Sequence, residues 1–294
     1  MPRPVAVVTG AAAGIGLETA RRLAATHRVA LLDIDADGVE RAAAAIPDAV
    51  WAACDITDAG EVGAAVERVV AECGGIDVCI SNAGIATAGA LRRLDPDVLA
   101  AQLNVNLVGN WRVVHACLPH LVERRGYVLG VASVGAIVAP PGLGAYAASK
   151  AGLEQLLDVL RIEVRHLGVD VGVAYFSWID TDMVRGTERH HADFASMRGR
   201  IRGPAGRTLP VADAADAIVR GVERRSRRVF APGWVAALSR LRGLVPELTD
   251  REGARMAPDI DRVTAELVAQ RGAFDAGLRP GERASDAAAR SAGR

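Results

Sequence analysis

The alternation of short apolar segments with longer amphipathic segments is the feature of this sequence that most constrains its fold. Through the first two-thirds of the chain, runs rich in β-branched residues are separated by alanine-rich stretches of helical periodicity. Apolar strands joined by helices favour right-handed βαβ units. We therefore expect an α/β fold, a doubly wound parallel sheet of about seven strands with helices on both faces.

The expected elements follow directly from this alternation. The strands are expected at Val5–Val8, Val29–Leu32, Val50–Ala53, Val78–Ile80, Tyr127–Ala132, Val169–Tyr175 and Arg228–Phe230. The helices are expected at Ile15–Ala25, Ala36–Ala45, Ala59–Glu72, Pro96–Leu118, Ala145–His166 and Ala212–Arg224. We assign residues 1–233 to one domain and residues 234–294 to a C-terminal extension, whose last residues, from Pro280, are expected to be disordered.

A glycine-rich turn lies between the first expected strand and the first expected helix. It reads Thr9-Gly10-Ala11-Ala12-Ala13-Gly14-Ile15-Gly16. Glycines there let the backbone approach a pyrophosphate, whose charge is stabilised by the helix N-terminus. Asp33 ends the second expected strand, where a carboxylate can hold an adenosine ribose diol. A plain tight turn followed by a solvated aspartate is the alternative, but the strand–turn–helix placement favours a Rossmann-type dinucleotide site.

Lys150 is the only lysine in the chain, and every other basic residue apart from histidine is an arginine. Arginine replaces lysine nearly everywhere on a surface, whereas a site that requires a compact ammonium does not accept it. Tyr146 precedes Lys150 by one helical turn, so the two side chains share a helix face. An ammonium beside a phenol stabilises the phenolate, which suits the pair to general acid–base chemistry.

With its GxxxGxG turn and YxxxK pair, the sequence resembles the short-chain dehydrogenase/reductase family. Further motifs of that family stand in the expected order over roughly residues 4–230. They are Asp55-Ile56 after the third strand, Asn82-Ala83-Gly84 after the fourth, Asn106 in the following helix, and Ser133 at the end of the fifth strand.

The resemblance implies a catalytic set of Asn106, Ser133, Tyr146 and Lys150. Tyr146 would act as general base in oxidation and general acid in reduction, and Ser133 would donate a hydrogen bond to the reacting oxygen. Asn106 would hold a water that links Lys150 to bulk solvent, and Lys150 would also reach the nicotinamide ribose. The implied cofactor-binding residues are Gly10, Ala13, Gly14, Ile15, Gly16, Asp33, Asp55, Ile56, Asn82, Ala83, Gly84, Tyr146, Lys150, Ile179 and Thr181.

Asp33 also bears on the choice between the two nicotinamide cofactors. A phosphate on the adenosine ribose would face the Asp33 carboxylate and be repelled. Relatives that prefer NADP place a basic residue where this chain has Ala13 or Ile34. We therefore predict NAD rather than NADP, with Arg28 and Arg41 nearby as the opposing feature.

The chain departs from the family pattern after the sixth strand. Where relatives have Pro-Gly, this chain has Phe176-Ser177, although Ile179 and Thr181 keep the positions expected to bind the carboxamide. A larger side chain there is expected to reshape the nicotinamide end of the site or to weaken cofactor binding.

The substrate site is expected beside these motifs and under a lid formed by residues 183–210, which show little periodicity. The candidates to bind substrate are Ser133, Val138, Leu143, Tyr146, Trp178 and Met183, with Phe194 and Met197 from the lid. The apolar members indicate an apolar pocket, or they simply pack the lid onto the body. The arginine surplus of the lid either attracts an anionic group on the substrate or is a solvated basic loop.

The sequence thus predicts an enzyme that moves hydride between NAD(H) and a secondary alcohol or ketone. The alternatives are an NADPH-dependent biosynthetic ketoreductase acting on a CoA-linked or carrier-linked substrate, and a catalytically idle NAD-binding protein. The resemblance also implies a homodimer or homotetramer built through the helices at Pro96–Leu118 and Ala145–His166.

Composition excludes several other classes of protein. The 35 basic and 35 acidic residues cancel, which argues against a nucleic-acid binder. The uncharged stretch 126–149 is interrupted by glycines and prolines, so we expect no membrane span, and the apolar start without a signal peptide predicts a cytoplasmic protein. The four cysteines are expected to be free thiols, and adjacent His190 and His191 do not share a helix face, so no metal site is expected.

Overall fold

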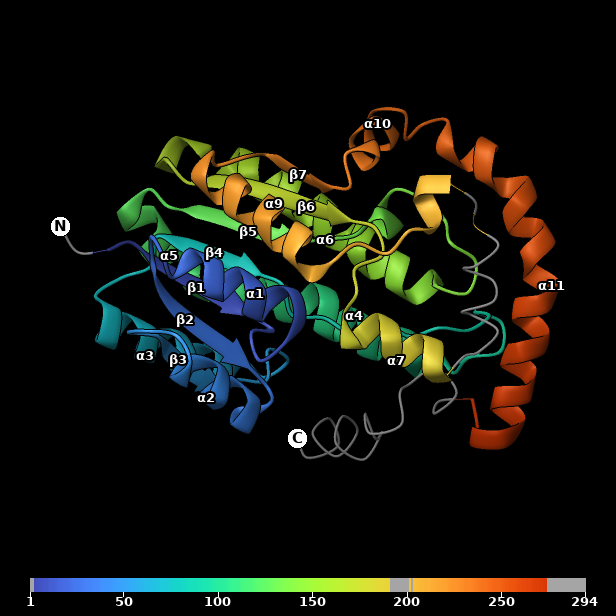
Figure 1. Cartoon of the computed structure of the whole chain (residues 1–294), viewed down its shortest axis with the longest axis horizontal. Coiled ribbons are helices and arrows are strands. Elements are labelled where there is room, and N and C mark those ends of the chain that lie inside the picture. The colour runs from blue at the N-terminus through green and yellow to red at the C-terminus, as the bar shows by residue number, and fades with distance from the viewer. Residues whose placement is uncertain (1–2, 191–200, 202, 274–294) are drawn as a thin grey trace.

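The computed structural model describes residues 3–190, 201 and 203–273, and its centre is a seven-stranded sheet (Figure 1). The strands are β1 (Val5–Thr9), β2 (Arg28–Asp33), β3 (Val50–Ala53), β4 (Val78–Ser81), β5 (Tyr127–Val131), β6 (Asp170–Phe176) and β7 (Arg228–Ala231). Their order is β3-β2-β1-β4-β5-β6-β7, and every neighbouring pair is parallel. The doubly wound α/β fold predicted from the sequence is therefore confirmed.

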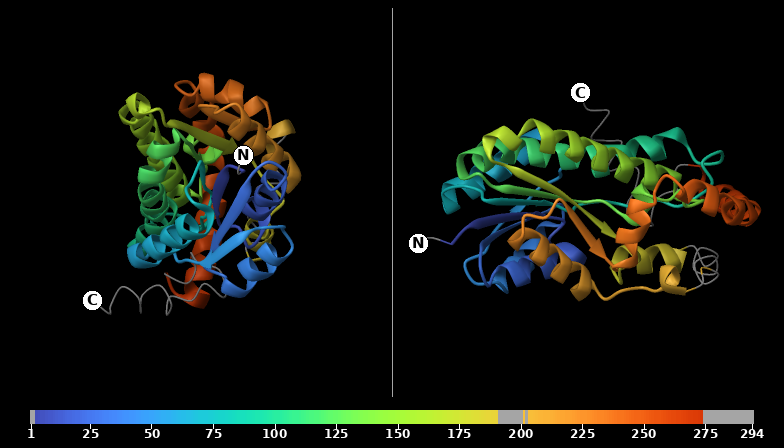
Figure 2. Two further views of the ribbon diagram at one scale, coloured as in Figure 1. Left: turned by 90° about the vertical axis from the view of Figure 1, so that its left-hand side faces the viewer. Right: turned by 90° about the horizontal axis from the view of Figure 1, so that it is seen from above.

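Helices cover both faces of the sheet (Figure 2). One face packs against α1 (Gly14–Leu23), α2 (Ala36–Ala44) and α9 (Val211–Glu223), and the other against α3 (Ala59–Cys73), α5 (Asn110–Arg124) and α6 (Gly144–Glu163). Successive residues of β1 alternate between these two apolar cores, Val5 and Val7 entering one and Ala6 and Val8 the other. Burial on both sides is why the strands are continuous apolar runs in the sequence.

The helix expected over Pro96–Leu118 is instead built from three pieces, which corrects that prediction. Helix α4 (Pro96–Leu103) leads into a π-helical segment, η1 (Asn104–Gly109), and then into α5, which continues to Arg124. Pro119 lies inside α5 and does not end it, because Leu121 in the next turn is fully buried. A π-helical turn adds one residue per turn and is frequently found at functional sites.

The region expected to be a structureless lid contains regular structure in its described part. Helix α7 (Asp182–His190) begins it, and a short 3₁₀ turn, η4 (Gly203–Gly206), lies near its end. Arg185 pairs with Asp180 and Asp182, which stabilises the first turns of α7. Residues 191–200 and 202, and with them the candidates Phe194 and Met197, lie outside the described residues.

The C-terminal extension forms α10 (Trp234–Arg240) and the long helix α11 (Val245–Arg271), which stands across the edge of the sheet where the strands end (Figure 1). Thr264 Oγ1 accepts a hydrogen bond of 2.8 Å from Ala90 N, and Asp261 pairs with Arg93 and Arg92. Hydrogen bonds from Arg93 and then Arg92 lower the pKa of Asp261 to about 2. Helix α11 thereby holds the loop that follows β4.

Three expectations from the sequence concern assembly, a membrane span and the last residues of the chain. Val159 and Ile162 on α6 are 44% and 68% exposed, so the helix face expected to form an assembly interface is open to solvent, and assembly stays a prediction. Within the described residues no helix is both long and apolar enough to cross a membrane. The expected disorder of the last residues falls outside the described part of the chain.

Gly130 in β5 allows α6 to pack closely onto the sheet. A Cβ atom at this position would lie 2.1 Å from Cδ1 of Leu157, a fully buried side chain of α6. Because β5 leads to Ser133 and α6 carries Tyr146 and Lys150, the absence of a side chain at Gly130 brings these three residues together.

We expect Gly130→Ala to lower the free energy of unfolding by ~1–3 kcal/mol, because the added methyl group overpacks the interface between α6 and β5. Gly63→Ala is the matched control. Gly63 lies within α3 with nothing within 4 Å of a Cβ, so alanine there should stabilise the protein by ~0.5–1 kcal/mol. Urea denaturation measures both changes, and equal stabilities of Gly130→Ala and the parent protein would contradict the packing argument.

Candidate active site

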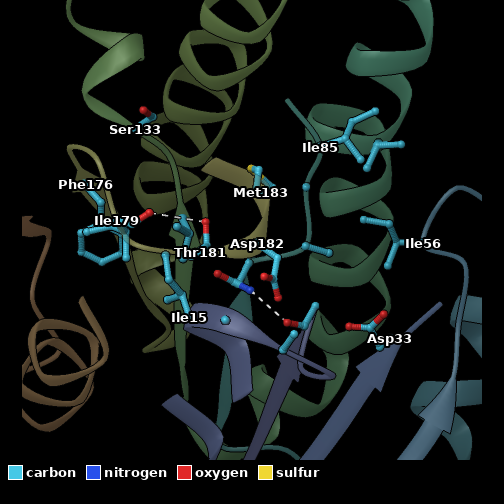
Figure 3. Close-up of a pocket in the computed structure, with 18 of the residues that line it drawn as sticks. Ile15, Asp33, Ile56, Ile85, Ser133, Phe176, Ile179, Thr181, Asp182 and Met183 are labelled. Carbon is cyan, nitrogen blue, oxygen red and sulfur yellow. Dashed lines mark hydrogen bonds between the residues drawn. The ribbon is translucent and has the colours of Figure 1, made fainter. Parts of the chain in front are cut away.

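A cavity of about 480 Å³ opens at the carboxyl ends of the central strands (Figure 3). It lies where β1 and β4 are neighbours, which is the point where the strand order reverses and where doubly wound sheets bind their ligands. Of the sequence-predicted cofactor residues, it is lined by Gly10, Ala13, Gly14, Ile15, Asp33, Asp55, Ile56, Asn82, Ala83, Gly84, Tyr146, Lys150, Ile179 and Thr181. The structure therefore gathers cofactor residues from six separate chain segments around one space.

The glycine-rich turn leaves the N-terminus of α1 open toward this cavity. Gly10 and Gly14 have φ values of +64° and +56°, which a residue with a side chain rarely adopts. Ala13, at the N-cap of α1, makes no side-chain capping hydrogen bond, so the first N–H groups of the helix can bind an anion. These features fit the pyrophosphate of a dinucleotide.

Gly16, also predicted to bind cofactor, does not line the cavity. A Cβ on Gly16 would lie 2.1 Å from the carbonyl oxygen of Gly10 and 2.8 Å from Nδ2 of Asn82. Gly16 therefore allows α1 to pack against the turn that precedes it.

Thr9 joins the glycine-rich turn to the segment after β4. Its Oγ1 accepts hydrogen bonds from the backbone N–H groups of Asn82 and Ala83, at 2.9 and 3.0 Å. Asn82 Nδ2 in turn donates to the carbonyl oxygen of Thr9 at 2.9 Å. These bonds fix the glycine-rich turn and the segment after β4 in position relative to each other, and both segments line the cavity.

Asp33 stands at the opposite side of the cavity from Ser133 (Figure 3). Its carboxylate accepts hydrogen bonds from Ala12 N at 2.9 Å and Asp35 N at 3.0 Å. Ile34 beside it is 62% exposed. Backbone N–H groups thus hold the Asp33 carboxylate at the edge of the cavity. The exposed side chain of Ile34 beside it offers an apolar surface against which a flat ring can pack.

Asn106 lies in the π-helical segment η1 and is completely buried, so it does not line the cavity. Its Oδ1 accepts a hydrogen bond from Ile85 N at 2.8 Å, and its Nδ2 donates to Ile85 O and to Ser149 Oγ at 2.9 and 3.0 Å. Its side chain therefore fixes the cavity wall at Ile85 and the helix turn between Tyr146 and Lys150. Holding a relay water stays a prediction for Asn106.

A second buried asparagine, Asn110, was not found from the sequence. Its Nδ2 donates to the carbonyl oxygens of Ala83, Val105 and Asn106 at 2.9 to 3.1 Å, and its Oδ1 accepts from Ser81 Oγ. Asn110 thereby ties the π-helical segment to Ser81 at the end of β4 and to Ala83 in the cavity wall. Its only sequence signal is its place four residues after Asn106.

Lys150 is 4% exposed, and its Nζ donates a hydrogen bond of 2.8 Å to the carbonyl oxygen of Val131. Burial lowers the pKa of this amine to about 8. The Nζ atom lies 5.9 Å from the centre of the Tyr146 ring. A Cβ on Gly84 would lie 3.4 Å from Nζ and 2.9 Å from Asn106 Oδ1, so Gly84 makes room for this polar cluster.

The phenol of Tyr146 lies in buried surroundings that oppose its ionisation. Burial raises the pKa of Tyr146, and a hydrogen bond with Ser133 offsets part of that rise. Ser133 Oγ also accepts a hydrogen bond of 3.1 Å from Gly135 N, which fixes its orientation. Lowering the phenol pKa to neutrality therefore requires positive charge beyond that of Lys150.

The Phe176-Ser177 pair occupies the end of β6. Phe176 lines the cavity yet is only 3% exposed, because it packs into the core beneath α1 and α9. Ser177 N donates to Ala231 O at 3.1 Å. Ile179 and Thr181 lie next to Phe176 and face the same space (Figure 3). The bulk of Phe176 is thus directed mainly into the core, and the cavity persists beside it.

Three of the expected substrate-binding residues, Ser133, Tyr146 and Met183, line the cavity. Val138, Leu143 and Trp178 are not among its lining residues in the described part of the chain. Residues that line it but were not proposed as binding residues are Leu32, Ile34, Cys54, Ile85, Val105, Val131, Ala132, Phe176, Ser177, Asp182 and Val184. Most of them directly follow or precede a predicted motif at a strand end, which is the signal that would have found them.

The four cysteines are free, as expected, and no cluster of potential metal ligands occurs among the described residues. Cys54 lines the cavity, but burial and then the nearby carboxylate of Glu61 raise the pKa of its thiol to about 12. It is therefore a protonated thiol at neutral pH and not a nucleophile.

Comparison with known proteins identifies the same family as the motifs. The sequence profile described as short chain dehydrogenase matches residues 4–192. The 2-(R)-hydroxypropyl-CoM dehydrogenase of Xanthobacter autotrophicus is 35% identical over 62% of this chain and 76% of its own length. The cis-4-hydroxycyclohexanecarboxylate dehydrogenase of Sinomonas cyclohexanicum is 33% identical over 73% of this chain and 87% of its own.

The fold is shared with solved structures. The 3-ketoacyl-(acyl-carrier-protein) reductase of Brucella melitensis, crystallised with NADH, superimposes with a TM-score of 0.70 at 27% identity. The match covers 78% of this chain and 97% of that protein.

We expect Lys150→Met to raise the free energy of unfolding at pH 7 by ~2 kcal/mol. The pKa of Lys150 falls from 10.5 to about 8, a cost of ~3 kcal/mol for keeping the amine protonated, against ~1 kcal/mol for the lost hydrogen bond to Val131. The unfolded chain binds the proton more tightly, so the parent protein gains stability as pH rises from 8 to 10.5. Denaturant unfolding at pH 7 and pH 10 should show that the stability difference between Lys150→Met and the parent protein is smaller at pH 10. A Lys150→Met variant that is less stable than the parent protein at pH 7 would contradict this prediction.

Proposed function

The chain belongs to the short-chain dehydrogenase/reductase family, and on this premise we propose that it interconverts a secondary alcohol and a ketone with NAD(H), using Tyr146 as general acid/base. The observation that carries the proposal is the convergence of Ser133, Tyr146 and the buried Lys150 at one end of a cavity whose other end holds Asp33. As a member of this family, the protein is an oxidoreductase that acts on hydroxyl and keto groups with a nicotinamide cofactor.

The nicotinamide cofactor, when bound, would accept or release the hydride. Gly10, Gly14 and the open N-terminus of α1 would hold its pyrophosphate, and Asp33 its adenosine ribose. Asp55 accepts hydrogen bonds from Thr57 N and Oγ1 through its Oδ1, which supports the wall expected at the adenine. Ile179 and Thr181 would hold the carboxamide end.

The catalytic steps of this chain's own residues follow from their surroundings. In oxidation, Tyr146 would take the proton of the substrate hydroxyl, and in reduction it would return it. Ser133 would donate a hydrogen bond to the same oxygen as its charge changes. Lys150 is held by Val131 beside the phenol, so its charge favours the phenolate, and the charge of an oxidised nicotinamide would add to that effect.

The substrate is proposed to be apolar. Ile85, Met183 and Val184 line the same cavity as Ser133 and Tyr146, and their side chains offer apolar atoms. The relatives named above support a hydroxyl-bearing substrate, since their names describe a hydroxypropyl and a hydroxycyclohexane compound.

We expect Tyr146→Phe to lower turnover of secondary alcohols by ~10²–10⁴-fold, because it removes the phenol that is proposed to move the substrate proton. Binding of NADH should stay within about twofold, since the phenyl ring still fills the space. Steady-state kinetics and NADH fluorescence titration measure the two effects. Tyr127→Phe makes the same chemical change outside the site and should leave turnover unchanged; turnover retained by Tyr146→Phe would refute the mechanism.

The choice of cofactor has its own test, a titration of the purified protein with NADH and with NADPH. At an effective dielectric near 20, an added phosphate ~5 Å from Asp33 is repelled by ~3 kcal/mol, so NADH should bind ~100-fold more tightly than NADPH. Asp33→Asn removes the charge, although its single amide oxygen can accept from only one of Ala12 N and Asp35 N, and it should narrow the preference for NADH over NADPH. Asp37→Asn, an exposed change nearby, should not. Tighter binding of NADPH to the parent protein would favour the biosynthetic ketoreductase.

A further inference from the structure

The segment between α10 and α11 contains Arg242, which reaches back toward the catalytic elements. Val235 and Val245 anchor the segment on either side, since both are buried in the same apolar core as Leu153 and Leu157 of α6. Arg242 stands between these anchors where α10 leads toward α11 (Figure 1). Its position is therefore set by the body of the protein and not by a loose loop.

Arg242 binds two elements at once. Its guanidinium forms a two-pronged ion pair with Glu154 of α6, Nη1 to Oε1 at 2.5 Å and Nη2 to Oε2 at 3.2 Å. Its Nη2 also donates to the carbonyl oxygen of Ala136 at 3.3 Å. A planar fork can satisfy a carboxylate and a carbonyl together, which a lysine ammonium does only with poorer geometry.

Both partners of Arg242 are close to catalytic residues along the chain. Glu154 lies one helical turn after Lys150 on the same face of α6 and is 3% exposed. Ala136 ends the 3₁₀ turn η2 (Val134–Ala136), which is capped by Ser133 through its bond to Gly135 N. A buried carboxylate requires a partner, so the pair is retained in the folded state.

We propose that Arg242 is a positioning residue that clamps the turn carrying Ser133 to the helix carrying Tyr146 and Lys150. This inference rests on the proposed function for its effect on turnover, whereas the clamp itself concerns only the chain. It gives the C-terminal extension a part in the geometry of the active site, since Ser133 and Tyr146 must act on one oxygen atom. A displacement of either by a fraction of an ångström would slow the reaction without closing the cofactor site.

A second arginine near Glu154, Arg228, supplies a matched control. Arg228 of β7 lies 4.0 Å from Glu154 and pairs with Asp158 at 2.5 Å. None of its hydrogen bonds reaches η2 within the described residues. Substituting Arg228 removes a cation near Glu154 but leaves the bonds of Arg242 to Glu154 and Ala136 in place.

The test compares Arg242→Gln, Arg242→Lys and Arg228→Gln in the full-length protein. Hydrogen–deuterium exchange, without any ligand, should be faster in residues 133–139 of Arg242→Gln and unchanged there in Arg228→Gln. The kcat of Arg242→Gln should fall ~10-fold while its Kd for NADH stays within about twofold. Arg242→Lys should recover part of the kcat, because it keeps the charge opposite Glu154.

The outcomes separate the clamp from simple stabilisation and from the proposed function. A lower melting temperature of Arg242→Gln with unchanged exchange and unchanged kcat would overturn the clamp. If Arg242→Gln does not fold, Glu154→Gln with Arg242→Gln removes the unpaired buried charge, and normal exchange in 133–139 of that variant would overturn it too. If the parent protein turns over no secondary alcohol, the proposed function fails, while the exchange data still decide on the clamp.

Discussion

The close packing of α6 on β5 is the constraint on which the rest of the site depends. Gly130 offers no side chain at the crossing, so Leu157 fills the space and the helix approaches the strand. The hydrogen bond from Lys150 Nζ to Val131 O then joins the two elements at the level of the cavity. This packing also buries Lys150, the only lysine in the chain, and burial lowers the pKa of its amine. Burying the amine destabilises the folded protein, and the packing of the surrounding apolar core offsets that loss.

A polar network inside an apolar framework sets the remaining geometry. Thr9, Asn82, Asn106 and Asn110 hold the ends of β1, β4 and the π-helical turn through buried hydrogen bonds. Such groups are costly to bury unless satisfied, so each one fixes the position of its partners. The proposed catalysis by Ser133 and Tyr146 would require that kind of preorganisation, because both would act on one atom of the substrate.

The C-terminal extension holds both the loop after β4 and the turn after β5 in place. Asp261 and Thr264 of α11 hold the segment at residues 90–93, and Arg242 holds the turn after Ser133. These loops border the end of the cavity where the substrate is proposed to bind.

The sequence by itself determined the order of strands and helices, the open turn at Gly10 and Gly14, and the shared helix face of Tyr146 and Lys150. These features depend on local periodicity and on spacings within one turn or one helix. The π-helical turn at Asn104–Gly109, the partners of Asn110 and the inward packing of Phe176 were decided only by the tertiary structure. Arg242 shows the reason most clearly: its partners Glu154 and Ala136 lie 88 and 106 residues away along the chain. No local pattern specifies which of the many arginines meets the buried carboxylate of Glu154, because that choice is made when the whole core packs.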